Sequence, residues 1–321
     1  MTSHLLKASP ETCHWGYFDA AQKPALRVSP GDTVRFETVS GRPEALAGLP
    51  AAFSAPPELA AIHQVLEPTL GPHILTGPVA VEGAQPGDTL EIRVNAVSPR
   101  QNWGYTQFRP GAGSLPEAFD HRCFEYIGID EEASVARPPW GGAIRLAPFP
   151  GVVGVAPPVS AGRITSIKPG EHGGNLDNKH ITAGARLFLP VHVPGGLISI
   201  GDGHGVQGDG EVCITALETA LSVDVTIELH RGWKIDAPFL ETPTHLVTMG
   251  LHEDLDECLK LALSRMIDQI VERTNLSRDH AYMLCSLSAD FHVTQNVNQI
   301  KGVHGMLERR ILSSIEGSES L

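Results

Sequence analysis

Residues 201–211, GDGHGVQGDGE, gather acidic and imidazole side chains in a glycine-rich segment. Asp202 and His204 are two residues apart, so in an extended segment their side chains point to the same side. Asp209 and Glu211 have the same spacing. Carboxylate oxygens and imidazole nitrogens bind divalent cations, and glycine lets a short loop aim several of them at one point. The segment predicts a metal site; the alternative is an Asp-Gly turn whose carboxylates are only solvated.

A nucleotide-binding loop is the competing interpretation, because residues 203–208, GHGVQG, match G-x-G-x-x-G. That motif requires a helix to begin inside the loop and face the pyrophosphate. The sequence EVCITALE at 211–218 predicts a strand instead, and no Lys or Arg lies between 187 and 230. Three carboxylates in the segment would repel phosphate, so we exclude this interpretation.

A second glycine-bracketed cluster, EHGGNLDNKH at 171–180, adds His172, Asp177 and His180. Two such segments in one chain strengthen the prediction of a metal site. A single histidine in either segment is more often structural or exposed than a ligand.

The elements that must position these residues are mostly strands. Alternating or continuous apolar patterns predict strands at 185–193, 197–200, 211–218 and 221–229. Pairing of 197–202 with 211–218 in a hairpin would gather Asp202, His204, Asp209 and Glu211 at one end. Segments 40–60 and 98–125 are expected to run over the surface and to form the walls of a pocket.

Helices are predicted only near the end of the chain, over about 253–273 and from an N-cap at Ser277 to about 289. We expect a single domain over 1–321, β-rich over 1–245, with a helical segment over 250–290 packed on it. The fold class is mainly β (α+β). The related sequences SPGDTVRF at 29–36 and QPGDTLEI at 85–92 indicate either a duplicated β unit or a common type II turn used twice.

Composition restricts the partners. The chain has 37 acidic and 24 basic residues and a net charge of -13, so we expect it to bind neither nucleic acid nor an anionic membrane surface. It has no run of 18 apolar residues and no secretory signal pattern. Its five scattered cysteines fit reduced thiols, so we expect a cytoplasmic protein.

Four blocks resemble the acetamidase/formamidase family, in the family's order: 14–34, 71–92, 173–218 and 288–307. The third block, which contains the glycine-rich segment, is the most specific. The resemblance implies a β-sandwich-type core with added helices and a homo-oligomer, a dimer or higher. It also implies a divalent metal, zinc in the first place and calcium as the alternative. The implied reaction converts small linear amides to carboxylate and ammonia.

On this basis we expect Asp202, His204 and Asp177 to bind the metal, which would activate a water molecule. Glu211 is the first choice for the general base, and Glu82 would complete the ligand set or act as a base. The remaining expectations are His73 as a catalytic contact to the oxyanion or the leaving group, and His14 and Asp209 as substrate-binding residues. No Gly-x-Ser-x-Gly elbow is present, and the acidic neighbours of Cys213 disfavour a thiolate.

Two other functions remain open. One is a metal-dependent hydrolase of esters, carbamates or phosphate esters. The other is a non-catalytic β-sandwich binding module with a structural calcium ion. Release of ammonia from a short amide would distinguish the predicted amidase from both.

Overall fold

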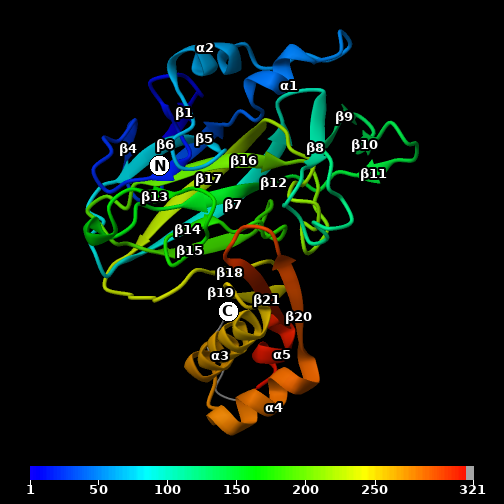
Figure 1. Ribbon diagram of the computed structural model, residues 1–321. Coiled ribbons are helices and arrows are strands. Elements are labelled where there is room, and N and C mark those ends of the chain that lie inside the picture. The colour runs from blue at the N-terminus through cyan, green and yellow to red at the C-terminus, as the bar shows by residue number, and fades with distance from the viewer. Residues whose placement is uncertain (316–321) are drawn as a thin grey trace.

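The computed structural model describes residues 1–315 and consists mainly of β-sheets, with helices at two opposite ends (Figure 1). The largest sheet has nine strands in the order β1 (Ser3–Leu6), β5 (Thr33–Glu37), β17 (Leu221–His230), β7 (Thr89–Pro99), β15 (Arg186–Pro190), β18 (Phe239–Glu241), β19 (His245–His252), β21 (Lys301–Glu308) and β20 (Ala289–Gln295). All its pairs are antiparallel except β1 with β5.

A second sheet of six strands faces the first. Its order is β14 (Gly173–Asn175), β12 (Phe149–Gly154), β16 (Ile198–His204), β6 (Ile74–Val81) and β2 (Cys13–Trp15), and β4 (Leu26–Val28) pairs in parallel with β6. The main core lies between the two sheets. Val223, Val225 and Ile227, on the alternating face of β17, share it with Ile198 and Ile200 of β16. The prediction of a mainly β, sandwich-type fold is therefore confirmed.

Smaller elements complete the β body. A four-stranded sheet has the order β11 (Ile144–Arg145), β10 (Val135–Arg137), β9 (Cys123–Asp130) and β8 (Trp103–Phe108), and β13 (Ile164–Thr165) pairs with β3 (Tyr17–Phe18). The helices are α1 (Pro43–Ala47), α2 (Pro57–Val65), the 3₁₀ turn η1 (Val159–Ala161), α3 (Leu255–Arg273), α4 (Arg278–Ser288) and α5 (Arg309–Ser313). No helix within residues 1–315 has both the length and the apolar character needed to cross a bilayer.

The two Pro-Gly-Asp turns occupy equivalent positions. Each is followed by a strand, β5 or β7, and these strands pair with the two edges of β17. In both turns the aspartate accepts a hydrogen bond from the backbone three residues earlier, at 3.1 Å for Asp32 and 2.9 Å for Asp88. Gly31 and Gly87 both have positive φ, as a type II turn requires.

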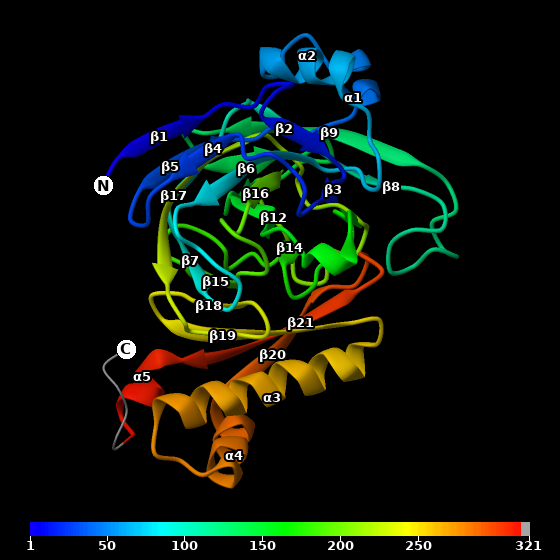
Figure 2. The same cartoon turned by 90° about the vertical axis from the view of Figure 1, so that its left-hand side faces the viewer.

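The chain beyond residue 245 differs in part from its prediction. Helices α3 and α4 form where expected, and Ser277 caps α4 by accepting a hydrogen bond from the His280 backbone amide. However, β19, β20 and β21 extend the large sheet in the same region, and α3 lies along β19 and β21 (Figure 2). Gly250 of β19 is where the helix comes closest: a Cβ atom there would lie 1.9 Å from the carbonyl oxygen of Cys258.

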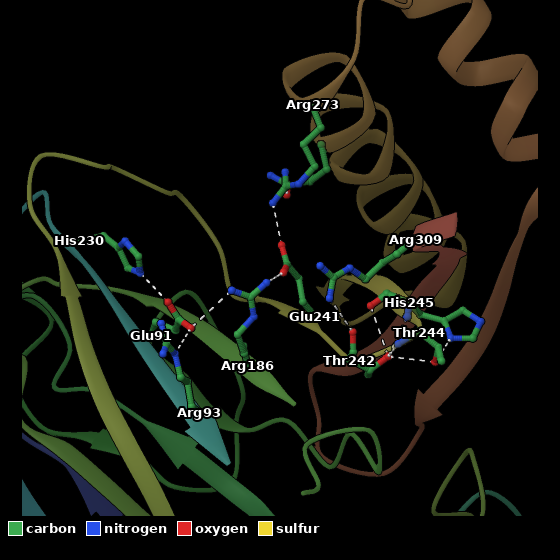
Figure 3. A network of polar contacts seen from close by, with 11 residues as sticks. Glu91, Arg93, Arg186, His230, Glu241, Thr242, Thr244, His245, Arg273 and Arg309 are labelled. Carbon is green, nitrogen blue, oxygen red and sulfur yellow. Dashed lines mark hydrogen bonds and ion pairs between the residues drawn. The ribbon is translucent and has the colours of Figure 1, made fainter. Parts of the chain in front are cut away.

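A buried polar network joins the β body to α3 (Figure 3). Glu241 of β18 accepts hydrogen bonds from Arg186 of β15 and from Arg273 at the end of α3. Glu91 of β7 pairs in turn with Arg93, Arg186 and His230. Burial raises the pKa of Glu91, but the hydrogen bonds from Arg93 and His230 lower this pKa by more than burial raises it, so the net shift is downward.

Candidate active site

The glycine-rich segment begins as β16, the central strand of the six-stranded sheet, which ends at His204. Nε2 of His204 lies 3.3 Å from Oδ2 of Asp202, so these two side chains are neighbours, as their spacing predicts. The intervening glycines allow close packing of the backbone. A Cβ atom on Gly201 would lie 2.4 Å from the carbonyl oxygen of Ile74, and one on Gly203 would lie 2.3 Å from that of Thr219.

Carboxylates surround the His204 ring on two sides. On the Nδ1 side, Oδ1 of Asp177 is 3.9 Å away. On the Nε2 side, Oε1 of Glu218 is 3.3 Å away, the same distance as Asp202. Two groups therefore have potential ligand atoms within 4.8 Å of one another: Asp177, His204 and Glu211, and Asp202, His204 and Glu218.

The predicted hairpin of 197–202 with 211–218 does not form. Strand β16 pairs with β6 and β12, and residues 211–217 form turns with no regular strand. Glu211 reaches the site through a backbone of positive φ, 45°. Because this segment is not a strand, Cys213 does not share a strand face with Glu211.

Backbone strain is concentrated at this site. Seven non-glycine residues among 1–315 have positive φ, and five of them line one cavity: Asp177, Asp202, Glu211, Ile214 and Gln299. A positive φ costs a non-glycine residue on the order of 1 kcal/mol, and such costs persist mainly where the surrounding structure imposes them, commonly at active sites.

Burial and mutual repulsion shift the pKa values of the carboxyl groups. Burial raises the pKa of Asp177 to about 7 and that of Glu218 to about 7. Burial and the charge of Asp177 raise the pKa of Glu211 well above its usual range. For Asp202, burial raises the pKa, but the charges of His73 and His204 outweigh it and bring the pKa below its usual range.

The His204 imidazole shows the opposite balance. Burial lowers its pKa, but the charges of Glu218 and Asp202 outweigh burial, so the pKa is raised well above 6.5. Either a proton or a metal cation would relieve the repulsion among the carboxylates around His204. The hydrogen-bond geometry favours the cation, because neither ring nitrogen of His204 has a hydrogen-bond partner among the described residues. Oδ1 of Asp177 and Oε2 of Glu211 are likewise buried without one.

The carboxylates of Asp177, Asp202, Glu211 and Glu218 form the floor of a cavity of about 730 Å³, and His204 is buried behind them. Its walls include Val39–Arg42 and the segment around Tyr105–Pro110, so the two surface excursions border a pocket as predicted. His73 is in the wall: Nε2 lies 3.8 Å from Oδ2 of Asp202, and Nδ1 lies 2.8 Å from Oγ of Ser166. Burial lowers the pKa of His73, so the ring is neutral near pH 7.

Comparison with known proteins shows the family of the chain. The model of the acetamidase/formamidase family matches residues 18–162 and 158–304. The chain belongs to the acetamidase/formamidase family. The solved structure of an acetamidase from Bacillus halodurans superimposes on it with a TM-score of 0.83 and 30% identity, covering 97% of this chain and 99% of the other.

Two curated members of the family are similar over a shorter length. An acetamidase from Mycolicibacterium smegmatis is 29% identical over an alignment of 219 residues, and the match covers 50% of this chain and 54% of the relative. A formamidase from Methylophilus methylotrophus is 28% identical over an alignment of 211 residues, and the match covers 49% of this chain and 51% of the relative. The chain spans about half the length of these curated relatives.

Three of the expected site residues of this acetamidase/formamidase family member do not line the cavity. Glu82 is exposed at the end of β6, where Oγ of Ser29 donates a hydrogen bond to it at 2.8 Å. Asp209 lies outside the cavity and pairs with Lys179 at 2.8 Å, because the loop turns outward after Gly208. His14 is buried beside the Tyr17 ring, with 5.1 Å between ring centroids, and does not line the cavity.

The second glycine-bracketed cluster separates in the same way. Asp177 lines the cavity, whereas His172 packs edge-on against Phe18 and His180 against His304. Paired glycines at 173–174 therefore position one carboxylate and not a set of ligands.

Residues that the sequence reasoning missed include Glu218, Tyr105 and Asn298. Glu218 is the last residue of the third matched block, but the alternating pattern around it predicts a strand with no special role. Its backbone pairs with Tyr105 in an isolated bridge, which brings β8 to the site. Asn298 donates a hydrogen bond to Oδ2 of Asp177 from the β20–β21 connection. Only the family resemblance of block 288–307 could have drawn attention to it.

Proposed function

We propose that this chain hydrolyses small linear carboxamides to carboxylate and ammonia with the help of a divalent cation. The observation that supports this proposal is a set of buried ligand atoms without hydrogen-bond partners among the described residues, on Asp177 and Glu211 at the floor of the cavity and on His204 directly behind it. Membership of the acetamidase/formamidase family supports the substrate class.

Asp177, Asp202 and His204 would hold the cation, and Glu218 joins them as a candidate because it shares the Nε2 side of His204. An imidazole among carboxylates favours zinc over calcium, which prefers oxygen ligands alone. When bound, such a cation would act as a Lewis acid on the amide carbonyl and would lower the pKa of water, so that hydroxide is available as a nucleophile near neutral pH.

Glu211 is the general base in this proposal. Its Oε2 atom is buried and has no hydrogen-bond partner, and its raised pKa suits transfer of a proton from the attacking water to the departing nitrogen. The neutral His73 ring orients the substrate. In the tautomer in which Nδ1 accepts from Ser166, Nε2 carries the proton and is a donor close to Asp202.

The proposal is tested on purified protein by metal analysis and by an ammonia assay with formamide and acetamide. We expect bound zinc or calcium, loss of turnover after chelation and its return when one of these ions is added back. Asp202→Asn and His204→Ala should lose both ion and turnover. Asp130→Asn, which changes an exposed carboxylate of β9, is the matched control.

Three results would contradict the proposal. Full amide hydrolysis by chelated, metal-free protein would exclude the cation. Bound metal without ammonia release from any amide would favour the binding module with a structural ion, and turnover of esters or carbamates alone would favour the other hydrolase. We also propose that the protein is a homo-oligomer, which light scattering would test.

A further inference from the structure

The cavity is far larger than the smallest amides require. Acetamide has four non-hydrogen atoms, whereas pockets of about 300–1,000 Å³ are typical for drug-sized ligands, and this one measures about 730 Å³. A second cavity of about 210 Å³ adjoins it, and the two share Arg42, Tyr105, Gln107 and Arg122. The site therefore has room for an acyl group that extends well beyond the reacting amide.

Three arginines line the outer part of this space: Arg42, Arg109 and Arg122. They are exposed, in contrast to the buried carboxylates of the floor. Within residues 1–315 none of the three makes an ion pair or a side-chain hydrogen bond. Most other arginines of the β body make ion pairs, for example Arg100 with Glu37 and Glu58, whereas Arg27 and Arg145, which are unpaired among the described residues, line neither cavity.

The fold brings these arginines together from separate segments. Phe108 and Cys123 are the last pair of β8 and β9, so Arg109 and Arg122 are the first and last residues of the loop that connects these two strands. Arg42 precedes α1, which is tied to the same hairpin by a 2.8 Å hydrogen bond from the Tyr126 hydroxyl to the Ala45 carbonyl oxygen. Like charges that face each other next to the end of a strand pair are unfavourable unless an anion lies between them.

We propose that Arg42, Arg109 and Arg122 select amides whose acyl group carries a carboxylate, that is, monoamides of dicarboxylic acids. This inference rests on the proposed amide hydrolysis. Guanidinium groups bind carboxylates through paired, charge-assisted hydrogen bonds. With the carboxylate at the arginines, the acyl chain leads the amide to the acidic floor. Water adds to the acyl carbon, the C–N bond breaks, and ammonia and the dicarboxylate leave.

The test compares the monoamide of glutaric acid with pentanamide, a neutral amide of the same length, in an ammonia assay. The wild-type protein should prefer the anionic amide in kcat/KM by roughly tenfold or more, since one charge-assisted contact has about this effect. Arg122→Ala should reduce that ratio about tenfold, and Arg122→Lys should restore part of it. Arg145→Ala, an exposed arginine that lines neither cavity, should keep the wild-type ratio.

A binding measurement separates this inference from the proposed function. Glutarate should bind more tightly than pentanoate in calorimetry, and added salt should weaken its binding. Equal turnover of both amides, with glutarate binding no tighter than pentanoate, would overturn the inference and leave amide hydrolysis intact. If no amide is hydrolysed, the proposed function fails, and tight binding of glutarate that Arg122→Ala removes would still support an anion site at the arginines.

Discussion

The side-chain amide of Asn298 donates a hydrogen bond to Oδ2 of Asp177, although 121 residues separate them in the chain. Both residues are buried, so this bond fixes the orientation of the carboxylate. It leaves Oδ1, the other oxygen, free to face His204 at 3.9 Å. The connection between β20 and β21 thereby closes one side of the candidate site.

Asn298→Ala should weaken metal binding by about tenfold to hundredfold, because hydrogen bonds to a ligand orient it and tune its basicity. Ion affinity is measured by competition with a fluorescent chelator. Asn296→Ala is the control, since Asn296 lies in the same connection and contacts Ser114 instead. Unchanged ion affinity in Asn298→Ala would mean that Asp177 is not a ligand.

Gly151→Ala tests whether turnover depends on the positions of the Asp177, Asp202 and His204 side chains. A Cβ atom at this position of β12 would lie 2.6 Å from Oδ1 of Asp177, 2.7 Å from Cε1 of His204 and 2.8 Å from Oδ2 of Asp202. These groups must shift, and a displacement of about 1 Å in a catalytic group costs roughly hundredfold in rate.

We therefore expect Gly151→Ala to lose amide hydrolysis while its circular dichroism spectrum stays that of the wild type. Gly208→Ala is the matched control, because a Cβ atom there meets nothing within 4 Å. Wild-type turnover by Gly151→Ala would show that the chemistry takes place elsewhere.

Glu241→Gln should destabilise the protein by about 3 kcal/mol, since removing one partner of a buried ion pair leaves the other charge uncompensated. Glu241 is 5% exposed and faces both Arg186 and Arg273. Urea unfolding followed by tryptophan fluorescence measures the change. Glu272→Gln, which alters an exposed carboxylate beside Arg273, should change the free energy of unfolding by less than about 1 kcal/mol. Equal effects of the two substitutions would contradict this account.

His14 makes stability depend on pH. Burial lowers its pKa to about 4, against 6.5 in the unfolded chain. Between these values the unfolded chain binds the proton and the folded protein does not, so this contribution to stability is complete above pH 6.5 and is lost as pH falls towards 4.

His14→Phe should remove the part of the unfolding free energy that is lost as pH falls, which amounts to about 3 kcal/mol. Other buried groups titrate in the same range, so the quantity to compare is the difference in unfolding free energy between wild type and variant at several pH values. His14→Asn serves if the larger ring does not fit. A difference that does not change with pH would mean that His14 has the same pKa in the folded and unfolded states.

The sequence predicted the local part of the site and not its long-range part. The spacing of Asp202 and His204 correctly predicted that the two side chains are neighbours, although Asp202 has a positive φ of 54° and is not extended. Glu211 was expected at the site for a wrong reason: it arrives through a strained turn and not through a hairpin. Glu218 and Asn298 depend on how β8, β20 and β21 pack around β16, which alternation along the chain does not encode.

The fold shows the same division. Periodicity identified β15, β16, β17 and both long helices within a few residues. It failed at 211–218, where alternation continues but β6 and β12 already occupy both edges of β16. The outward position of Asp209 follows from the same turn, since its partner Lys179 lies outside the cavity.

The bond between Asn298 and Asp177 also has a consequence for the order in which the protein matures. During synthesis, every carboxylate of the candidate site is made before Asn298, and β21 is made later still. A growing chain therefore contains the carboxylates of the candidate site before it contains the Asn298 amide, which orients Asp177. An ion bound at the proposed site would therefore meet its final ligand geometry only after residue 298 has been made.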